Sequence, residues 1–173
     1  MRAAERGFVE AVRMLLKSNA KTNIPDLHGN RTPSSVFIRH HRSASLDILF
    51  ACISDGTQRQ QECFSIIMSD AMANINEASA AGKPLLLAAC EKGEPMAKIC
   101  SMLLERGADV HAIDRATGQT ALHAACASGS MRIVRELLQR GADVNARDAQ
   151  QQTPAHAAVT SNTFEVIDLV PLG

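Results

Sequence analysis

The stretch DRATGQTALHAACASGSMRIVRELLQRGADVNAR, residues 114–147, decides the fold of this chain. Its segment 120–126 consists mostly of small residues, which let a neighbouring helix approach closely, and Gly129 accepts the positive φ that ends a helix. The second half carries one apolar stripe at spacings of one, three and four, formed by Ile133, Val134, Leu137 and Leu138. This stretch therefore predicts two short helices joined by a tight turn.

Two helices of this length bury too little apolar surface to be stable alone, so the pair needs neighbours on both sides. The pattern starts again at Asp148, 34 residues after Asp114, and an earlier copy starts at Ser79. After each second helix, a Gly-Ala-Asp segment at 107–109 or 141–143 predicts the start of an extended loop. The sequence is therefore expected to form a stack of helix pairs.

The whole of 114–147 resembles one nearly complete ankyrin repeat, and the chain resembles a member of the ankyrin-repeat family. The resemblance implies an all-α ankyrin-repeat solenoid of stacked helix-turn-helix units with an irregular second repeat. We expect one domain over residues 1–173, divided into a partial repeat (1–25), a repeat with a helical insertion of about 20 residues (26–78), two repeats (79–113 and 114–147) and a partial repeat (148–173). Because the pattern begins and ends inside a repeat, we also expect a fragment of a longer protein.

The segment 26–78 departs most from the repeat pattern. Apolar residues predict two helices within it, around 46–53 and around 64–72, and a turn between them at 54–58. We expect a helical extension at about 43–60 to account for the insertion.

The composition argues against an enzyme. Hydrophobic residues make up 46% of the chain but aromatic residues only 3%, which fits thin, closely packed helices better than a pocket lined by aromatic side chains. The sequence contains no nucleophile motif and no glycine-rich phosphate loop, because its glycines recur at the repeat spacing. We therefore expect neither catalysis nor a cofactor.

The charges give no support for nucleic-acid binding, since the formal net charge is zero. The first 42 residues carry eight lysines and arginines against three acids, which we interpret as solvated helix faces. The five cysteines form no C-x-x-C pair, and no signal peptide or long apolar run is present. We expect a monomeric intracellular domain, cytoplasmic or nuclear, without membrane insertion.

His123, Cys126 and the matching Cys90 raise the question of a metal site, because histidine and cysteine at such spacing can ligate zinc. The ankyrin resemblance favours another role. In such repeats the histidine of a Thr-x-x-His motif forms hydrogen bonds locally at the turn, and the cysteine position takes a small residue for packing. We therefore expect no metal, and we expect His156 to act beside Thr153 as His123 does.

The resemblance also implies where a partner binds, namely the loops between repeats and the exposed side of the first helices, which form a concave groove. The matching positions are Ala80, Ala81, Lys83, Glu91, Lys92, Arg115, Thr117, Gln119, Ala127, Ser128, Ala149, Gln150, Gln152, Thr160 and Ser161. The implied function is a non-catalytic scaffold that binds a protein or peptide. Two alternatives stay open: an inhibitor or regulator that masks a partner through the irregular region 34–72, and a regulatory domain of a larger enzyme or channel.

Asn145 is a candidate for modification. The run LLQRGADVN, residues 137–145, is similar to the pattern that an asparaginyl hydroxylase acting on ankyrin proteins recognises. The alternative is that Asn145 is a loop residue whose side chain holds the turn by hydrogen bonds to the backbone.

Overall fold

The computed structural model describes residues 14, 49–50, 52–53, 57–70, 74–79 and 81–170. The chain forms two compact parts, Met1–Asn74 and Ile75–Gly173. The expected partial repeat at 1–25 and most of the expected extension at 43–60 lie outside the described residues. The five-segment division of the chain stays a prediction.

In the N-terminal part, helix α4 spans Gln58–Asp70. Thr57 and Gln60 begin it with reciprocal hydrogen bonds: the Thr57 N–H donates to Gln60 Oε1 at 3.3 Å, and the Gln60 N–H donates to Thr57 Oγ1 at 3.4 Å. Gln58, which was expected in the turn at 54–58, therefore lies in the helix, and residues 54–56 lie outside the described residues. Cys63 and Phe64 are fully buried on one face of α4.

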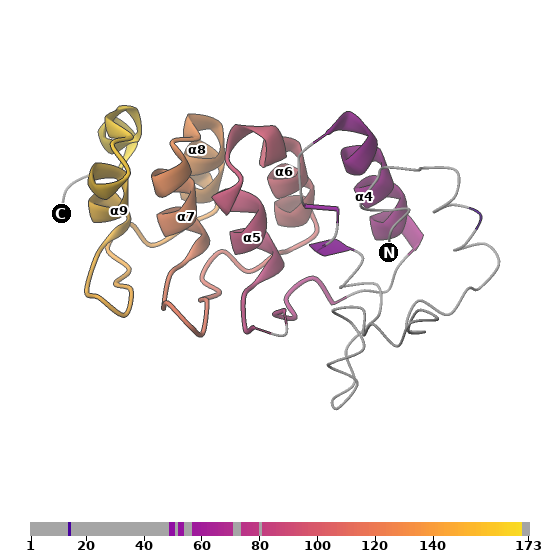
Figure 1. Cartoon of the computed structure of the whole chain (residues 1–173), viewed down its shortest axis with the longest axis horizontal. Coiled ribbons are helices and arrows are strands. Elements are labelled where there is room, and N and C mark those ends of the chain that lie inside the picture. The colour runs from indigo at the N-terminus through magenta and orange to yellow at the C-terminus, as the bar shows by residue number, and fades with distance from the viewer. Residues whose placement is uncertain are drawn as a thin grey trace, which may run out of the picture. The chain divides into compact units, whose positions relative to one another are not determined.

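The C-terminal part is built from helix pairs stacked in two rows (Figure 1). The first row contains α5 (Leu85–Glu91), α7 (Ala121–Ser128) and α9 (Pro154–Thr160). The second row contains α6 (Ala97–Glu105), α8 (Met131–Gln139) and the 3-10 helix η3 (Phe164–Leu169), and a short 3-10 turn, η2 (Glu94–Met96), leads into α6. In the described part of the chain, β structure is limited to two isolated bridges. The predicted all-α fold of stacked helix pairs is confirmed.

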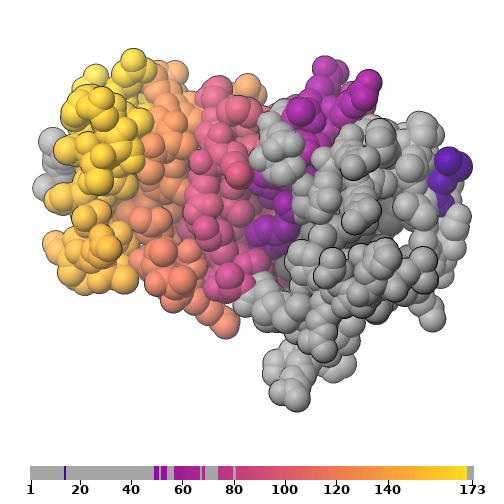
Figure 2. All heavy atoms as spheres, viewed as in Figure 1, coloured from indigo at the N-terminus to yellow at the C-terminus, as the bar shows by residue number. Residues whose placement is uncertain are grey.

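The first-row helices pack closely because small residues face one another. Helix α7 packs between α5 and α9, and its buried residues are mostly small: Ala121, Ala124, Ala125 and Cys126, together with Leu122. Figure 2 shows successive helix pairs of this part in contact along their length. The packing explains why so little aromatic volume is needed.

The start of α7 is held by a buried histidine. His123 Nδ1 lies 3.2 Å from the backbone nitrogen of Thr120 and 2.9 Å from its hydroxyl oxygen. Because Nδ1 accepts the Thr120 N–H, Nε2 carries the ring proton and donates to the backbone carbonyl of Gln152, at 3.0 Å. Thr153 and His156 repeat the local arrangement at α9, so the structural role expected for both histidines is confirmed.

The loops between helix pairs are tied to one another. The backbone N–H of Arg115 donates to the carbonyl of Gly82 at 3.3 Å, and that of Ala149 donates to the carbonyl of Thr117 at 3.0 Å. The approach is close enough that a Cβ added to Gly118 would lie 2.8 Å from the Ala149 nitrogen. We call this pair of bonds the loop ladder. It fixes each loop relative to the preceding one.

Two helix pairs depart from the regular pattern. Glu94–Met96 form the 3-10 turn η2 before α6, with Pro95 in it. The second helix of the last pair, Phe164–Leu169, is a 3-10 helix, not an α-helix. Val170 is extended, with φ −102° and ψ 103°, as favoured for a residue that precedes a proline, here Pro171. This sequence therefore ends the helix after six residues.

Candidate protein-binding surface

The residues predicted to contact a partner recur at the same places in successive repeats of the C-terminal part. They come from the loops that precede the first-row helices and from the C-terminal ends of those helices, and the loops extend from the same edge of the stack in Figure 1. We call this set of residues the loop face. Its exposed members are Ala81, Glu91, Lys92, Arg115, Thr117, Ala149, Gln150, Thr160 and Ser161, and its half-buried members are Lys83, Gln119, Ala127, Ser128 and Gln152. Ala80 lies outside the described residues.

The loop face has one internal ion pair and two unpaired cations. Lys83 Nζ lies 2.6 Å from Glu91 Oε1, and both side chains are about one third exposed, at 31% and 38%. Such a pair contributes little to stability, roughly 0–1 kcal/mol, so a partner could replace it. The side chains of Lys92 and Arg115 are exposed and make no ion pair or hydrogen bond within the described residues. The net positive charge of the face therefore lies beside α5.

Two buried aspartates shape the loops that carry this face. Asp114 Oδ1 accepts the Ala116 N–H at 3.0 Å, and Asp148 Oδ1 accepts the N–H groups of Gln150 and Gln152 at 2.8 and 2.9 Å. Burial by itself raises the pKa of Asp148, but the hydrogen bonds from Gln152 and Gln150 outweigh it, so its pKa lies below the ordinary range. The charged form of Asp148 is thus part of the loop structure.

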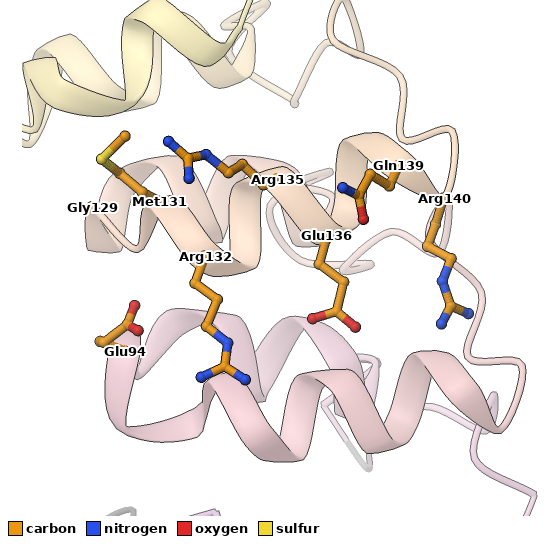
Figure 3. A pocket seen from close by; sticks show the side chains of 8 residues that line it. All are labelled: Glu94, Gly129, Met131, Arg132, Arg135, Glu136, Gln139 and Arg140. Atoms are coloured by element: carbon orange, nitrogen blue, oxygen red, sulfur yellow. The ribbon is translucent and has the colours of Figure 1, made fainter.

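A second feature was not predicted from the sequence. An open depression of about 710 Å³ lies on the outer side of α8, and Figure 3 shows the side chains around it. It is lined by Glu94, Gly129, Met131, Arg132, Arg135, Glu136, Gln139 and Arg140. From the sequence alone, exposed charges on a helix are expected to face solvent. The packing of α8 against α6 and the hydrogen bond from Ser130 to Glu94 bring Glu94 close to the arginines of α8.

The hydrogen bonds of the depression involve its carboxylates and one arginine. The Ser130 hydroxyl donates to Glu94 at 2.5 Å, and the Ser101 hydroxyl donates to Glu136 at 2.6 Å. Arg140 Nη1 donates to the backbone carbonyl of Leu104, also at 2.5 Å. These bonds join α8 to the preceding helix pair.

Asn145, the candidate for modification, is exposed. Its turn is held by Asp143, whose side chain accepts the Asn145 N–H at 2.9 Å. Within the described residues the Asn145 side chain itself forms no hydrogen bond, so the Asp143 carboxylate is the side chain that bonds to this turn. The side chain at the matching position, Asn76, instead bonds to the next loop, at the Gly107 carbonyl and the Asp109 N–H.

All five cysteines are buried, and burial raises the pKa of the Cys126 thiol to about 12. Cys90 and Cys100 face each other with their sulfur atoms 3.8 Å apart. Over the described ranges, no group of three or more His, Cys, Asp or Glu side chains could hold a metal ion. None of the helices within those ranges is both long and apolar enough to span a bilayer.

A family model described as ankyrin repeats, in three copies, matches residues 85–171, just over half of the chain. The match covers α5 to η3 and therefore the helix pairs that carry the loop face and the depression. Repeats of this family are generally protein–protein interaction modules and are typically not enzymes. The chain belongs to the ankyrin-repeat family.

Proposed function

We propose that this chain is a non-catalytic scaffold that binds a protein or peptide through its loop face. The supporting observation is the loop ladder: the bonds from Arg115 to Gly82 and from Ala149 to Thr117 hold exposed residues of successive loops in fixed positions. A surface that is ordered before binding pays less conformational entropy when a partner binds. The proposal includes an intracellular, monomeric domain that needs no cofactor.

The charges of the loop face suggest which residues to test. Lys92 and Arg115 are exposed and unpaired within the described chain, so replacing them breaks no ion pair or hydrogen bond of their charged groups. Lys83 is a poorer choice, because its replacement by an acid would place that acid beside Glu91.

The test is affinity capture from lysate with wild type and the variant Lys92→Glu/Arg115→Glu, followed by titration of each captured protein in purified form. The matched control is Lys98→Glu/Arg147→Glu, which makes the same charge change at exposed residues that belong neither to the loop face nor to the depression. A partner that binds wild type and the control, but binds the loop-face variant at least about tenfold more weakly, supports the proposal. Equal binding by all three proteins argues against it.

The role of the irregular region 34–72 as a masking element remains an alternative hypothesis, and most of that region lies outside the described residues. Replacing it by an ordinary repeat separates the two ideas. Loss of partner binding after that replacement, with the loop face unchanged, would assign the function to the irregular region.

We also propose Asn145 as a hydroxylation site. Its side chain is exposed and, unlike that of Asn76, makes no hydrogen bond within the described residues. An enzyme could therefore reach it without breaking a contact of the described fold.

A further inference from the structure

The depression on α8 is separate from the loop face. None of the residues that line it belongs to the loop face, and seven of its eight lining residues lie in the stretch 129–140. The eighth, Glu94, comes from the preceding helix pair. A ligand bound here would leave the loop face open.

The depression has more positive than negative groups, and its negative groups are already hydrogen-bonded. Its lining contains three arginines and two glutamates. Glu94 and Glu136 each accept a hydrogen bond from a serine hydroxyl, and Arg140 donates to a backbone carbonyl. The side chains of Arg132 and Arg135 are exposed and form no hydrogen bond or ion pair within the part of the chain that the structure describes.

The acids on the neighbouring helix η3 do not neutralise these arginines by ion pairs. Glu165 and Asp168 of η3 are exposed and form no ion pair with Arg135. Two guanidinium groups therefore present their N–H donors to solvent beside a depression. Guanidinium binds carboxylates through paired, charge-assisted hydrogen bonds.

We propose that this depression binds an acidic peptide segment, with one carboxylate on Arg132 and a second on Arg135. Met131 lies in the same depression and is half-buried, so it offers an adaptable apolar contact to the residues between the two acids. Such a segment would complement the charge of the depression and displace only water from these two arginines.

The directions of the two arginines set the spacing of the acids. Figure 3 shows Arg132 extending from α8 toward α6, between Glu94 and Glu136, whereas Arg135 extends away from α6. A peptide that contacts both must cross α8, whose diameter with side chains is about 10–12 Å. An extended chain advances roughly 3.3 Å per residue. The two acids should therefore be separated by about three to four positions.

The experiment uses fluorescein-labelled peptides and fluorescence anisotropy with the full chain. One peptide carries two aspartates four positions apart among glycine, serine and alanine, and its partner peptide carries asparagine at both places. The test variant is Arg132→Gln/Arg135→Gln. The matched control, Lys98→Gln/Arg147→Gln, removes the same charge from exposed residues that belong neither to the loop face nor to the depression. Circular dichroism checks that both variants are folded.

We expect the aspartate peptide to bind wild type and the control equally, and to bind the test variant at least about tenfold more weakly. The asparagine peptide should bind all three proteins weakly. Equal weakening by both variants would show general charge attraction and overturn the proposal, as would no binding of the aspartate peptide at millimolar protein. Binding of a phosphoserine peptide in place of the aspartate peptide would assign a phosphate site and also overturn it.

Discussion

His123 Nε2 lies 3.0 Å from the backbone carbonyl oxygen of Gln152, so a side chain of one helix pair donates directly to the loop of the next. His156 occupies the matching position in α9 and makes the same local bonds to Thr153, but it is exposed. Both histidines therefore cap the start of a helix. Within the described residues, His123 also joins its helix pair to the next one.

We expect His123→Ala to lower the free energy of unfolding by about 2–4 kcal/mol, because the buried Thr120 N–H loses its partner, the Gln152 carbonyl keeps only the hydrogen bond from the Asp148 N–H, and a cavity remains. His156→Ala, which removes only an exposed cap, should cost about 1 kcal/mol. Urea unfolding followed by circular dichroism measures both values. Equal losses for the two variants would contradict a joining role for His123.

Gly118→Ala and Gly141→Ala test the loop ladder. Both glycines have positive φ, 71° and 82°, so both substitutions carry a backbone cost of roughly 1 kcal/mol. A Cβ at Gly118 would also lie 2.8 Å from the Ala149 nitrogen, whereas a Cβ at Gly141 meets nothing within 4 Å. We therefore expect Gly118→Ala to destabilise the protein by at least about 1 kcal/mol more than Gly141→Ala does, in thermal or urea unfolding. Equal costs would mean that the loops do not need this close approach.

Gln151→Gly should stabilise the protein. Gln151 has φ 62° and stands two residues before a helix cap, at the position that Gly118 holds in the preceding loop. Glycine removes the steric cost of this conformation but loses more entropy on folding, so the net gain should be about 0.5 kcal/mol. The melting temperature should rise by a degree or more. A fall in melting temperature would show that the Gln151 side chain contributes contacts that outweigh the strain.

Asp148→Asn should reduce the acid sensitivity of the fold. The pKa of Asp148 is lower in the folded chain than its ordinary value of 3.8, so the carboxylate contributes stability above that value and loses it as pH falls through the folded pKa. Between pH 6 and pH 3, wild type should therefore lose more stability than the variant. Asp168→Asn, at an exposed carboxylate, is the control. If both variants behave like wild type, Asp148 is not the relevant group.

Hydroxylation of Asn145 would add one oxygen atom to the chain. We expect intact-mass analysis of protein from animal cells to show this addition and peptide fragmentation to place it on Asn145. Asn145→Gln should remove the added mass. Unmodified wild-type protein from those cells would reject this proposal.

Local rules were enough to predict much of this fold. Gly129 predicted a positive φ from the local sequence, and the ankyrin resemblance implied both histidine caps at the Thr-x-x-His motifs that start at 120 and 153. The last pair has the short 3-10 helix η3 in place of a second α-helix, and Pro171 follows that helix closely in the sequence. The left-handed Gln151 was missed, since its conformation follows from the loop register and glutamine carries no signal for it.

The candidate sites were less predictable. The loop-face positions could be placed by their resemblance to ankyrin repeats, because those positions recur with the repeat. The depression on α8 could not, because Arg132 and Arg135 look like any solvated arginines until Glu94 is brought beside them by the preceding helix pair. Surface charge becomes a site only through neighbours that are distant in sequence.

The loop ladder also limits how this binding surface can change. Since the Ala149 N–H bonds to Thr117 and the Arg115 N–H bonds to Gly82, a substitution that moves one loop also moves the loop tied to it. Substitutions in adjacent loops should therefore combine non-additively in double-mutant cycles. New specificity would more readily arise through paired changes in neighbouring repeats than through single replacements.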